Sequence, residues 1–165
     1  MAEITFKNQP VHTCGTLPSK GSTAPDFVLT NGNLEDVTLE TYRGKKKVLN
    51  IVPSLDTGVC ATSARKFDKE IAKRDDAICL TISADLPFAA TRFCKTEGVA
   101  NVITLSEMRD RSFGRDYGCE MIDGPLAGLL SRAVVVLDEE NTVLHVEQVP
   151  EIAQEPDYLA ALTAL

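Results

Sequence analysis

The chain has 165 residues, of which 44% are hydrophobic, and 24 acidic against 17 basic side chains give it a net charge of −7. This length and composition predict one domain with a buried core, extending over residues 1–165. The negative charge argues against nucleic acid and against an anionic membrane surface as partners. No apolar run is long enough to span a bilayer, and the first residues lack the apolar segment of a secretory signal.

The first half of the chain predicts several strands and then a helix. Strands are expected at residues 4–6 and 11–13, as a hairpin around a turn at 7–10, and then at 26–29 and 47–52. Pro53 ends the last of these, which has the composition of a central strand. After it, Cys60, Ala64, Phe67 and Ile71 recur at steps of four, three and four residues, which is the spacing of one helix face.

The second half continues this alternation. A buried strand is expected at 78–83, and a helix follows with Asp85 as its N-cap, Pro87 in its first turn and Gly98 at its end. The remaining elements are expected as a short strand at 102–105, a helix at 109–117, a hairpin of strands at 133–137 and 142–146, and a final helix opened by residues 155–157. This order predicts an α/β fold in which helices flank a sheet of mixed strand directions.

Five cysteines are spread along the chain without a repeating spacing, at Cys14, Cys60, Cys79, Cys94 and Cys119. An odd number of this kind does not form the disulfide framework of a secreted protein. The chain has two histidines and no Cys-x-x-Cys pair, so a structural zinc site is not expected either. We therefore expect a cytoplasmic type of chain, with the periplasm as the alternative, in which some thiols are free to react.

The segment between the central strand and the first helix carries the residues best suited to chemistry. Cys60 is expected in the first turn of the helix, where unpaired backbone N–H groups and the helix dipole favour a thiolate. Thr57 lies three residues earlier and suits the N-cap, from which its hydroxyl also reaches the sulfur. Pro53 has no N–H and supplies an apolar wall. The spacing of these three residues predicts a reactive thiol at Cys60.

Pro53-x-x-x-Thr57-x-x-Cys60 resembles the active-site signature of peroxiredoxins. Further segments resemble the bacterial thiol peroxidase branch, the atypical two-cysteine peroxiredoxins, and they occur in order at residues 50–60, 83–89, 92–94, 101–106, 123–126, 132–136 and 155–158. The resemblance covers nearly the whole chain. It implies a thioredoxin-like mixed sheet flanked by helices, with an added N-terminal β-hairpin. It implies a homodimer and no metal, flavin or haem.

The resemblance also implies a role for individual residues. It makes Cys60 the peroxidatic cysteine, Cys94 the resolving cysteine and Arg132 the catalytic arginine. The implied substrates are hydrogen peroxide and organic hydroperoxides, and the implied reductant is thioredoxin. Attack on peroxide would give a sulfenic acid at Cys60, which a second thiol of the same chain condenses to a disulfide. A guanidinium fixed at Arg132 would stabilise the thiolate and polarise the O–O bond.

Other interpretations use the same residues. Taken singly, Cys60 fits a buried structural cysteine, Cys94 an ordinary helix residue and Arg132 a surface ion pair. Cys14, Cys79 and Cys119 match no motif and are expected to be structural. An alternative function is a peroxide-responsive redox sensor that uses the same cysteines without significant turnover. A binding module with an inactive site is a weaker alternative, because Pro53, Thr57, Cys60 and Arg132 are all present.

Overall fold

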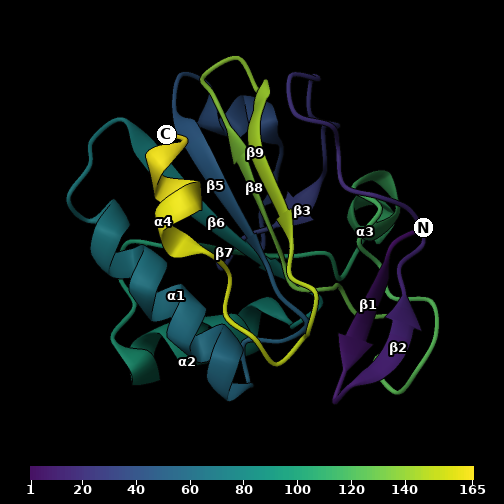
Figure 1. Ribbon diagram of the computed structural model, residues 1–165. Coiled ribbons are helices and arrows are strands. Elements are labelled where there is room, and N and C mark those ends of the chain that lie inside the picture. The colour runs from purple at the N-terminus through teal and green to yellow at the C-terminus, as the bar shows by residue number, and fades with distance from the viewer.

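The computed structural model describes residues 1–165, and its centre is a seven-stranded sheet (Figure 1). The strands lie in the order β4-β3-β7-β6-β5-β8-β9. Their bounds are β3 Leu29–Thr30, β4 Asp36–Val37, β5 Lys46–Ile51, β6 Ala77–Ser83, β7 Ile103–Ser106, β8 Ala133–Leu137 and β9 Val143–Gln148. Strand β6 pairs in parallel with β5 and β7, whereas β8 pairs antiparallel with β5 and β9. The predicted mixed sheet is confirmed.

The N-terminal hairpin forms a separate small sheet of β1 (Glu3–Phe6) and β2 (Gln9–His12). Lys7 and Asn8 make its turn with positive φ angles of 52° and 62°, the geometry that fits the twist of a two-residue hairpin. Pro10, expected in the turn, lies instead in β2 opposite Thr5. A proline is tolerated there because an edge strand does not need every N–H.

Helices α1 (Gly58–Ile71), α2 (Pro87–Glu97) and α4 (Tyr158–Thr163) lie on one side of the sheet, and α3 (Ser112–Asp116) lies on the other, near the hairpin (Figure 1). A 3₁₀ helix, η1 (Leu39–Tyr42), precedes β5. Alternate residues of the central strands therefore bury against different layers. No helix has both the length and the apolar composition needed to cross a membrane.

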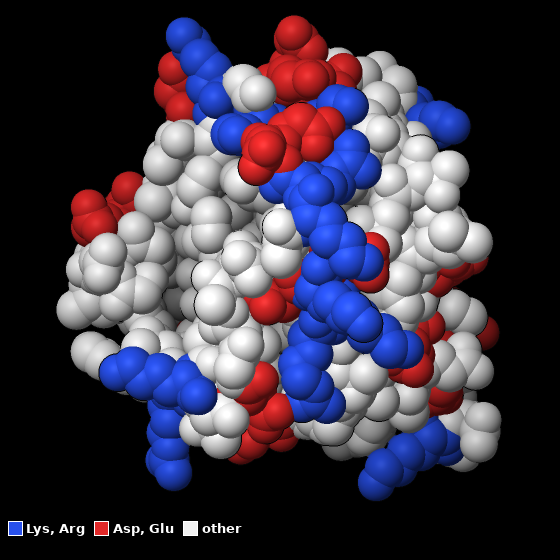
Figure 2. Space-filling view, turned by 90° about the vertical axis from the view of Figure 1, so that its left-hand side faces the viewer, with Lys and Arg blue, Asp and Glu red and all other residues white.

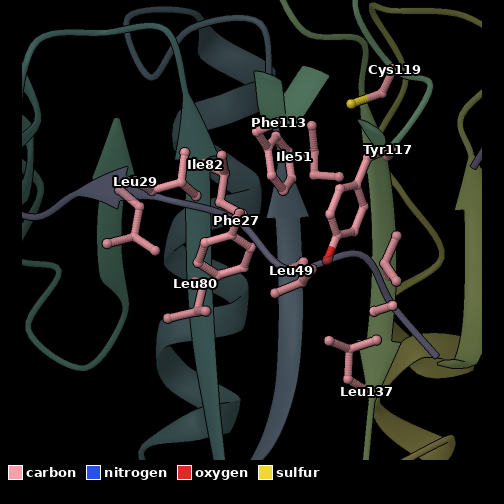
Figure 3. Close-up of a cluster of buried hydrophobic side chains, with 14 of the residues drawn as sticks. Phe27, Leu29, Leu49, Ile51, Leu80, Ile82, Phe113, Tyr117, Cys119 and Leu137 are labelled. Atoms are coloured by element: carbon pink, nitrogen blue, oxygen red, sulfur yellow. The ribbon is translucent and has the colours of Figure 1, made fainter. Parts of the chain in front are cut away.

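The two faces of the sheet bury separate apolar clusters. Leu49 and Ile51 of β5 point into the larger one, with Leu80 and Ile82 of β6 and Phe113 of α3 (Figure 3). The opposite face buries a second cluster beneath α1, which contains Val48, Phe67, Ile71, Cys79, Val134, Val136 and Ala161. The face of α1 predicted from its spacing is confirmed, since its four residues are all buried.

Three predicted elements differ from the structure. Residues 26–29 do not form a full strand, because only Leu29 joins Thr30 in β3 while Phe27 turns into the core against Phe113. The helix expected at 109–117 is shortened to α3. Helix α2 begins at Pro87 with Leu86 as its N-cap, so the N-cap predicted at Asp85 is wrong.

The side of the molecule that carries α1, α2 and α4 has a local positive surface in spite of the negative net charge. Figure 2 shows Lys and Arg side chains there in a nearly continuous column. Three exposed basic residues lie on α1 itself, at Arg65, Lys66 and Lys69, and exposed Lys73 follows just after its end. The opposite side of the same helix is buried and carries Cys60 and Asp68. Helix α1 thus has a solvated basic face and a face that turns toward the interior.

Candidate active site

Cys60 lies in the first turn of α1, and its side chain is fully buried. Thr57 is the N-cap, as predicted: its Oγ1 accepts a hydrogen bond from the backbone N–H of Cys60 at 3.3 Å. The same hydroxyl donates to the carbonyl of Ser54 at 3.4 Å. Cys60 therefore lies at the N-terminal end of α1, where the positive end of the helix dipole favours a negative charge.

Arg132 lies directly before β8 and is only 2% exposed. Its Nη2 donates to Cys60 Sγ at 3.2 Å, and its Nε donates to the carbonyl of Ile152 at 2.7 Å. Its Nη1 is buried and has no hydrogen-bond partner. An unpaired buried donor costs about 1–3 kcal/mol, so a ligand oxygen that accepts from Nη1 recovers this free energy. The guanidinium is thus fixed at the sulfur with one donor free.

The register of the sheet explains this meeting of distant residues. Strand β8 pairs antiparallel with β5 so that Ala133 lies opposite Ile51. Arg132, one residue before Ala133, therefore lies beside the end of β5, where the loop to Cys60 begins. Pro53, the first proline of that loop, is buried. The structure brings Cys60 into contact with both Thr57 and Arg132, and it places Pro53 in the loop that leads to Cys60.

Asp85 holds this loop in place, a role that the sequence interpretation missed. Its Oδ1 accepts from Ser54 Oγ at 2.8 Å, and its Oδ2 accepts from the N–H of Leu55 at 2.7 Å and from Ser83 Oγ at 2.8 Å. Asp85 does not cap α2 because its carboxylate is taken up by these three donors. Its position after β6, the parallel neighbour of β5, was the available signal, since the carboxyl ends of parallel strands meet at one edge of a sheet.

Asp85→Ala is expected to lower the free energy of unfolding by about 2–3 kcal/mol, because it leaves donors of a charge-assisted network unpaired at a half-buried position. Urea denaturation followed by circular dichroism measures this loss. The matched control is Asp56→Ala, since Asp56 is exposed in the same loop and its carboxylate accepts no hydrogen bond. Equal stabilities of the two variants would contradict the assigned role of Asp85.

Apolar side chains enclose Cys60, and a groove lies above them. Val52, Leu55, Ala64 and Ala90 form the cluster around the sulfur, with Phe93 packed against it. A cavity of about 400 Å³ lies between the active-site loop and α2, lined by Leu55, Asp56, Asp85, Ala89, Arg92, Phe93, Thr96 and Glu97. A smaller cavity of about 220 Å³ shares four of these residues and reaches Thr57 and Gly58. The groove therefore gives small molecules a route toward the start of α1.

Cys94 is not in contact with Cys60. It lies on α2, is partly buried, and packs against the cluster beneath α1, whereas Cys60 belongs to the separate cluster around Val52. Burial raises the pKa of the Cys94 thiol, and the negative charge of Asp68 raises it further. All five cysteines are free thiols. The predicted resolving thiol is thus in the neighbouring helix, in an environment that favours its protonated form.

The other three cysteines lie away from this site. Cys79 and Cys119 are fully buried, and burial raises the pKa of both thiols strongly. Cys14 is half-buried, and its Sγ donates to the carbonyl of Gly114 at 3.5 Å. No arginine or lysine donates to any of the three sulfurs. These surroundings fit the structural role expected for them.

The C-terminal segment covers α1 beside the site. Tyr158 packs its ring edge against Phe67, with ring centres 5.2 Å apart. Its hydroxyl donates to Glu155, which also pairs with Lys66 of α1 at 2.9 Å. Burial is the main cause that raises the pKa of Tyr158, and the hydrogen bond to Glu155 adds to it. The sequence predicted that residues 155–157 open the final helix, which is confirmed by α4 with Asp157 as its N-cap. The contact of this segment with α1 depends on tertiary packing and was not predicted.

Comparison with known proteins agrees with this geometry. The redoxin family model matches residues 19–162. Thiol peroxidases of Mycobacterium tuberculosis and Mycobacterium bovis are each 53% identical over 165 residues, which cover 100% of this chain and 99% of the relative.

Solved structures match over nearly the whole chain. A peroxiredoxin-like protein from Aquifex aeolicus is 34% identical with a TM-score of 0.92, covering 99% of this chain and 96% of that one. A thiol peroxidase from Chromobacterium violaceum, at 23% identity, shares the fold with a TM-score of 0.91, covering 98% of this chain and 93% of that one. The chain has the predicted thioredoxin-like fold, and it belongs to the redoxin family and to the thiol peroxidases within it.

Proposed function

We propose that the protein is a thiol-dependent peroxidase that reduces hydrogen peroxide and organic hydroperoxides through Cys60, with the whole chain acting as one domain. The observation that carries the proposal is the 3.2 Å contact between Arg132 Nη2 and the buried sulfur of Cys60, beside an Nη1 that has no partner. The 53% identity to thiol peroxidases supports the same chemistry.

The first half of the reaction oxidises Cys60. The Cys60 thiolate attacks one peroxide oxygen, the O–O bond breaks, and the other oxygen leaves as water or an alcohol after taking up a proton. Cys60 becomes a sulfenic acid as the peroxide is reduced. Donors fixed before the reaction stabilise the negative charge that develops on the oxygens. In this proposal Arg132 Nη1, which has no partner, supplies such a donor, the Thr57 hydroxyl at the N-cap orients the peroxide, and buried Pro53 helps to exclude water.

The second half restores the thiol. Cys94 attacks the sulfenic sulfur, a Cys60–Cys94 disulfide forms, and water leaves. Thioredoxin then reduces this disulfide by thiol–disulfide exchange, in which its own two thiols are oxidised to a disulfide. A disulfide needs Cα atoms within about 7 Å, and the two cysteines pack in separate clusters on separate helices. The proposal therefore includes unwinding of α2, which buries only Pro87 and Ala90 fully and so opens at low cost.

The decisive experiment measures peroxide turnover with thioredoxin, thioredoxin reductase and NADPH. Many turnovers per protein molecule are expected. A redox sensor is the second candidate function, favoured by the depth at which Cys60 is buried, which would suit a rare oxidation event. A sensor would consume one equivalent of peroxide and stop, and that result would overturn the peroxidase proposal.

Oxidation is expected to raise hydrogen exchange over residues 86–98 and to give a chain of monomer size on a non-reducing gel, because both cysteines belong to one chain and α2 must unwind. Cys94→Ser leaves the sulfenic acid unresolved, so thioredoxin-linked turnover should fall more than tenfold. Hydrogen-exchange mass spectrometry of reduced and oxidised protein tests the unwinding.

Two results would contradict this intramolecular scheme. A covalent dimer that is lost in Cys94→Ser would show that the disulfide links two chains. Unchanged exchange across both helices after disulfide formation would refute the unwinding of α2.

The proposal also includes a non-covalent homodimer and a cytoplasmic location. Two large apolar side chains are exposed at the start of α2 beside the groove, Leu86 at 54% and Phe88 at 67%, and burial against a second copy would remove them from water. Free thiols and a thioredoxin-type reductant suit a reducing compartment. Analytical ultracentrifugation of the wild type and of Phe88→Glu tests the assembly, and a wild-type monomer at micromolar concentration would count against it.

A further inference from the structure

Asp68 is a carboxylate on the interior side of α1, only 9% exposed. Its Oδ1 accepts from the backbone N–H groups of Ala100, Asn101 and Val102 at 3.1, 2.5 and 2.9 Å. Its Oδ2 accepts from Asn101 Nδ2 at 3.3 Å. One side chain thus binds the last three residues of the turn that connects α2 to β7. Hydrogen bonds to a charged acceptor are the strong kind, so this connection is well fixed.

The bound turn begins directly after the helix that carries Cys94. Helix α2 ends at Glu97, and Gly98 follows as its C-cap with a left-handed φ of 67°. The carbonyl of Cys94 accepts from the N–H groups of Gly98 and Val99. Unwinding the chain around Cys94 breaks these two bonds, and the next residue, Ala100, is held by Asp68. The last residue that can unwind without loss of the Asp68 contacts is therefore Val99.

The segment is also held at its other end. Asp85 binds the active-site loop through Ser54 and Leu55, immediately before α2. The chain between Asp85 and the anchored residues 100–102 contains α2 and Cys94. Its start is bound to the active-site loop that leads to Cys60, and its end is bound to Asp68 on the helix that carries Cys60. A segment tied at both ends keeps a released thiol near its target, because a short tether gives a high effective concentration.

The lengths allow the disulfide to form while Asp68 keeps its contacts. Cys60 and Asp68 are eight residues apart on α1, which is about 12 Å along the helix axis. The six residues from Cys94 to Ala100 reach up to about 20 Å when extended. The tether is therefore longer than the distance it has to cover.

We propose that Asp68 is a positioning residue for disulfide formation: it anchors residues 100–102 to the helix that carries Cys60, so that α2 unwinds only as far as Val99 and holds Cys94 on a short tether. This inference rests on the proposed function, since it concerns the resolving step of that reaction. Asp68 itself takes no part in making or breaking bonds. Because its contacts exist before and after unwinding, they do not oppose the opening of α2.

Hydrogen exchange tests the anchor directly. On oxidation of the wild type, amides of residues 86–99 should exchange at least tenfold faster, and those of Ala100, Asn101 and Val102 should change less than twofold. In reduced Asp68→Ala, these three amides should exchange at least tenfold faster than in the wild type. Glu70→Ala is the matched control on the same helix, because Glu70 pairs only with Lys73 at the surface. Loss of protection at 100–102 on oxidation of the wild type would overturn the proposal, even if Asp68→Ala does not fold.

Rapid-mixing kinetics separate the reaction of Cys60 with peroxide from the formation of the Cys60–Cys94 disulfide. Asp68→Ala should react with peroxide at a rate within twofold of the wild type, because the contacts of Cys60 with Thr57 and Arg132 are unchanged. Disulfide formation should be slower by roughly twofold or more, since the tether then runs to β7 and effective concentration falls with its length. More sulfinic acid should appear at Cys60 as a result. Faster disulfide formation would show that the contacts or the charge of Asp68 oppose the resolving step, and would overturn the proposal.

Asp68→Asn distinguishes the effect of the hydrogen bonds that anchor residues 100–102 from the effect of the negative charge. It keeps an oxygen that accepts from the backbone, so residues 100–102 should keep most of their protection and the disulfide should form at nearly the wild-type rate. A variant as slow as Asp68→Ala with those amides protected would contradict anchoring. If no Cys60–Cys94 disulfide forms in the wild type, the proposed function fails together with this inference. If the disulfide forms in the wild type but Asp68→Ala does not form it more slowly than the wild type and Asp68→Asn, only this inference is contradicted.

Discussion

Cys60→Ser is expected to reduce thioredoxin-linked peroxide turnover to the background rate, the largest effect of any single substitution in this chain. A serine hydroxyl is not ionised at neutral pH and does not attack a peroxide oxygen, although its size lets it occupy the same buried position. The fold should persist, because Cys60 contributes a small apolar volume to the cluster around Val52 and Leu55. Coupled NADPH oxidation measures the rate, and circular dichroism confirms the fold.

The other cysteines supply matched controls for this substitution. Cys14→Ser, Cys79→Ser and Cys119→Ser should each keep more than half of the wild-type turnover, because none of these sulfurs contacts a cationic side chain. Cys79→Ser and Cys119→Ser place a hydroxyl in a fully buried site and should lower the free energy of unfolding by about 1–3 kcal/mol. Substantial turnover by Cys60→Ser, or loss of turnover in one of the three controls, would show that the nucleophile is not Cys60 alone.

The regular elements near the site were accessible from the sequence because short-range patterns determine them. The steps of four, three and four from Cys60 to Ile71 defined the buried face of α1, and the Thr57 cap followed from residue type and spacing. Gly98 also ended α2 as predicted, since a left-handed residue at that position favours glycine. These features depend on contacts within a few residues.

The arrangement of the site was less accessible because it depends on which strands pair. Arg132 reaches Cys60 only because β8 lies beside β5 with Ala133 opposite Ile51, a register that no local pattern specifies. Only the family resemblance singled out this arginine. Asp68 carried a readable signal, a carboxylate next to Phe67 on the buried side of α1. Such a residue needs a buried partner, but the partner, a turn some thirty residues later, cannot be identified from spacing.

Arg132→Lys is expected to slow the oxidation of Cys60 by peroxide by about 100-fold, comparable to the loss of a fixed donor in other active sites. Lysine keeps the positive charge but has no planar fork, so it cannot contact Cys60 Sγ, the carbonyl of Ile152 and a peroxide oxygen together. Part of the loss should be seen before peroxide is added, as a changed rate of alkylation of Cys60, because lysine does not reproduce the hydrogen bond of Arg132 Nη2 to the sulfur.

The size of this effect distinguishes a fixed donor from a general positive field. If charge alone mattered, Arg132→Lys would keep nearly the full rate, because the net charge is unchanged. Arg43→Lys is the matched control, since Arg43 is exposed and pairs only with Glu40, and its rate should equal that of the wild type. Stopped-flow measurement of the second-order rate constant for both variants decides the question. An unchanged rate and alkylation profile in Arg132→Lys would remove Arg132 from the reaction, whereas a loss confined to the peroxide step would assign its unpaired Nη1 to the substrate oxygen.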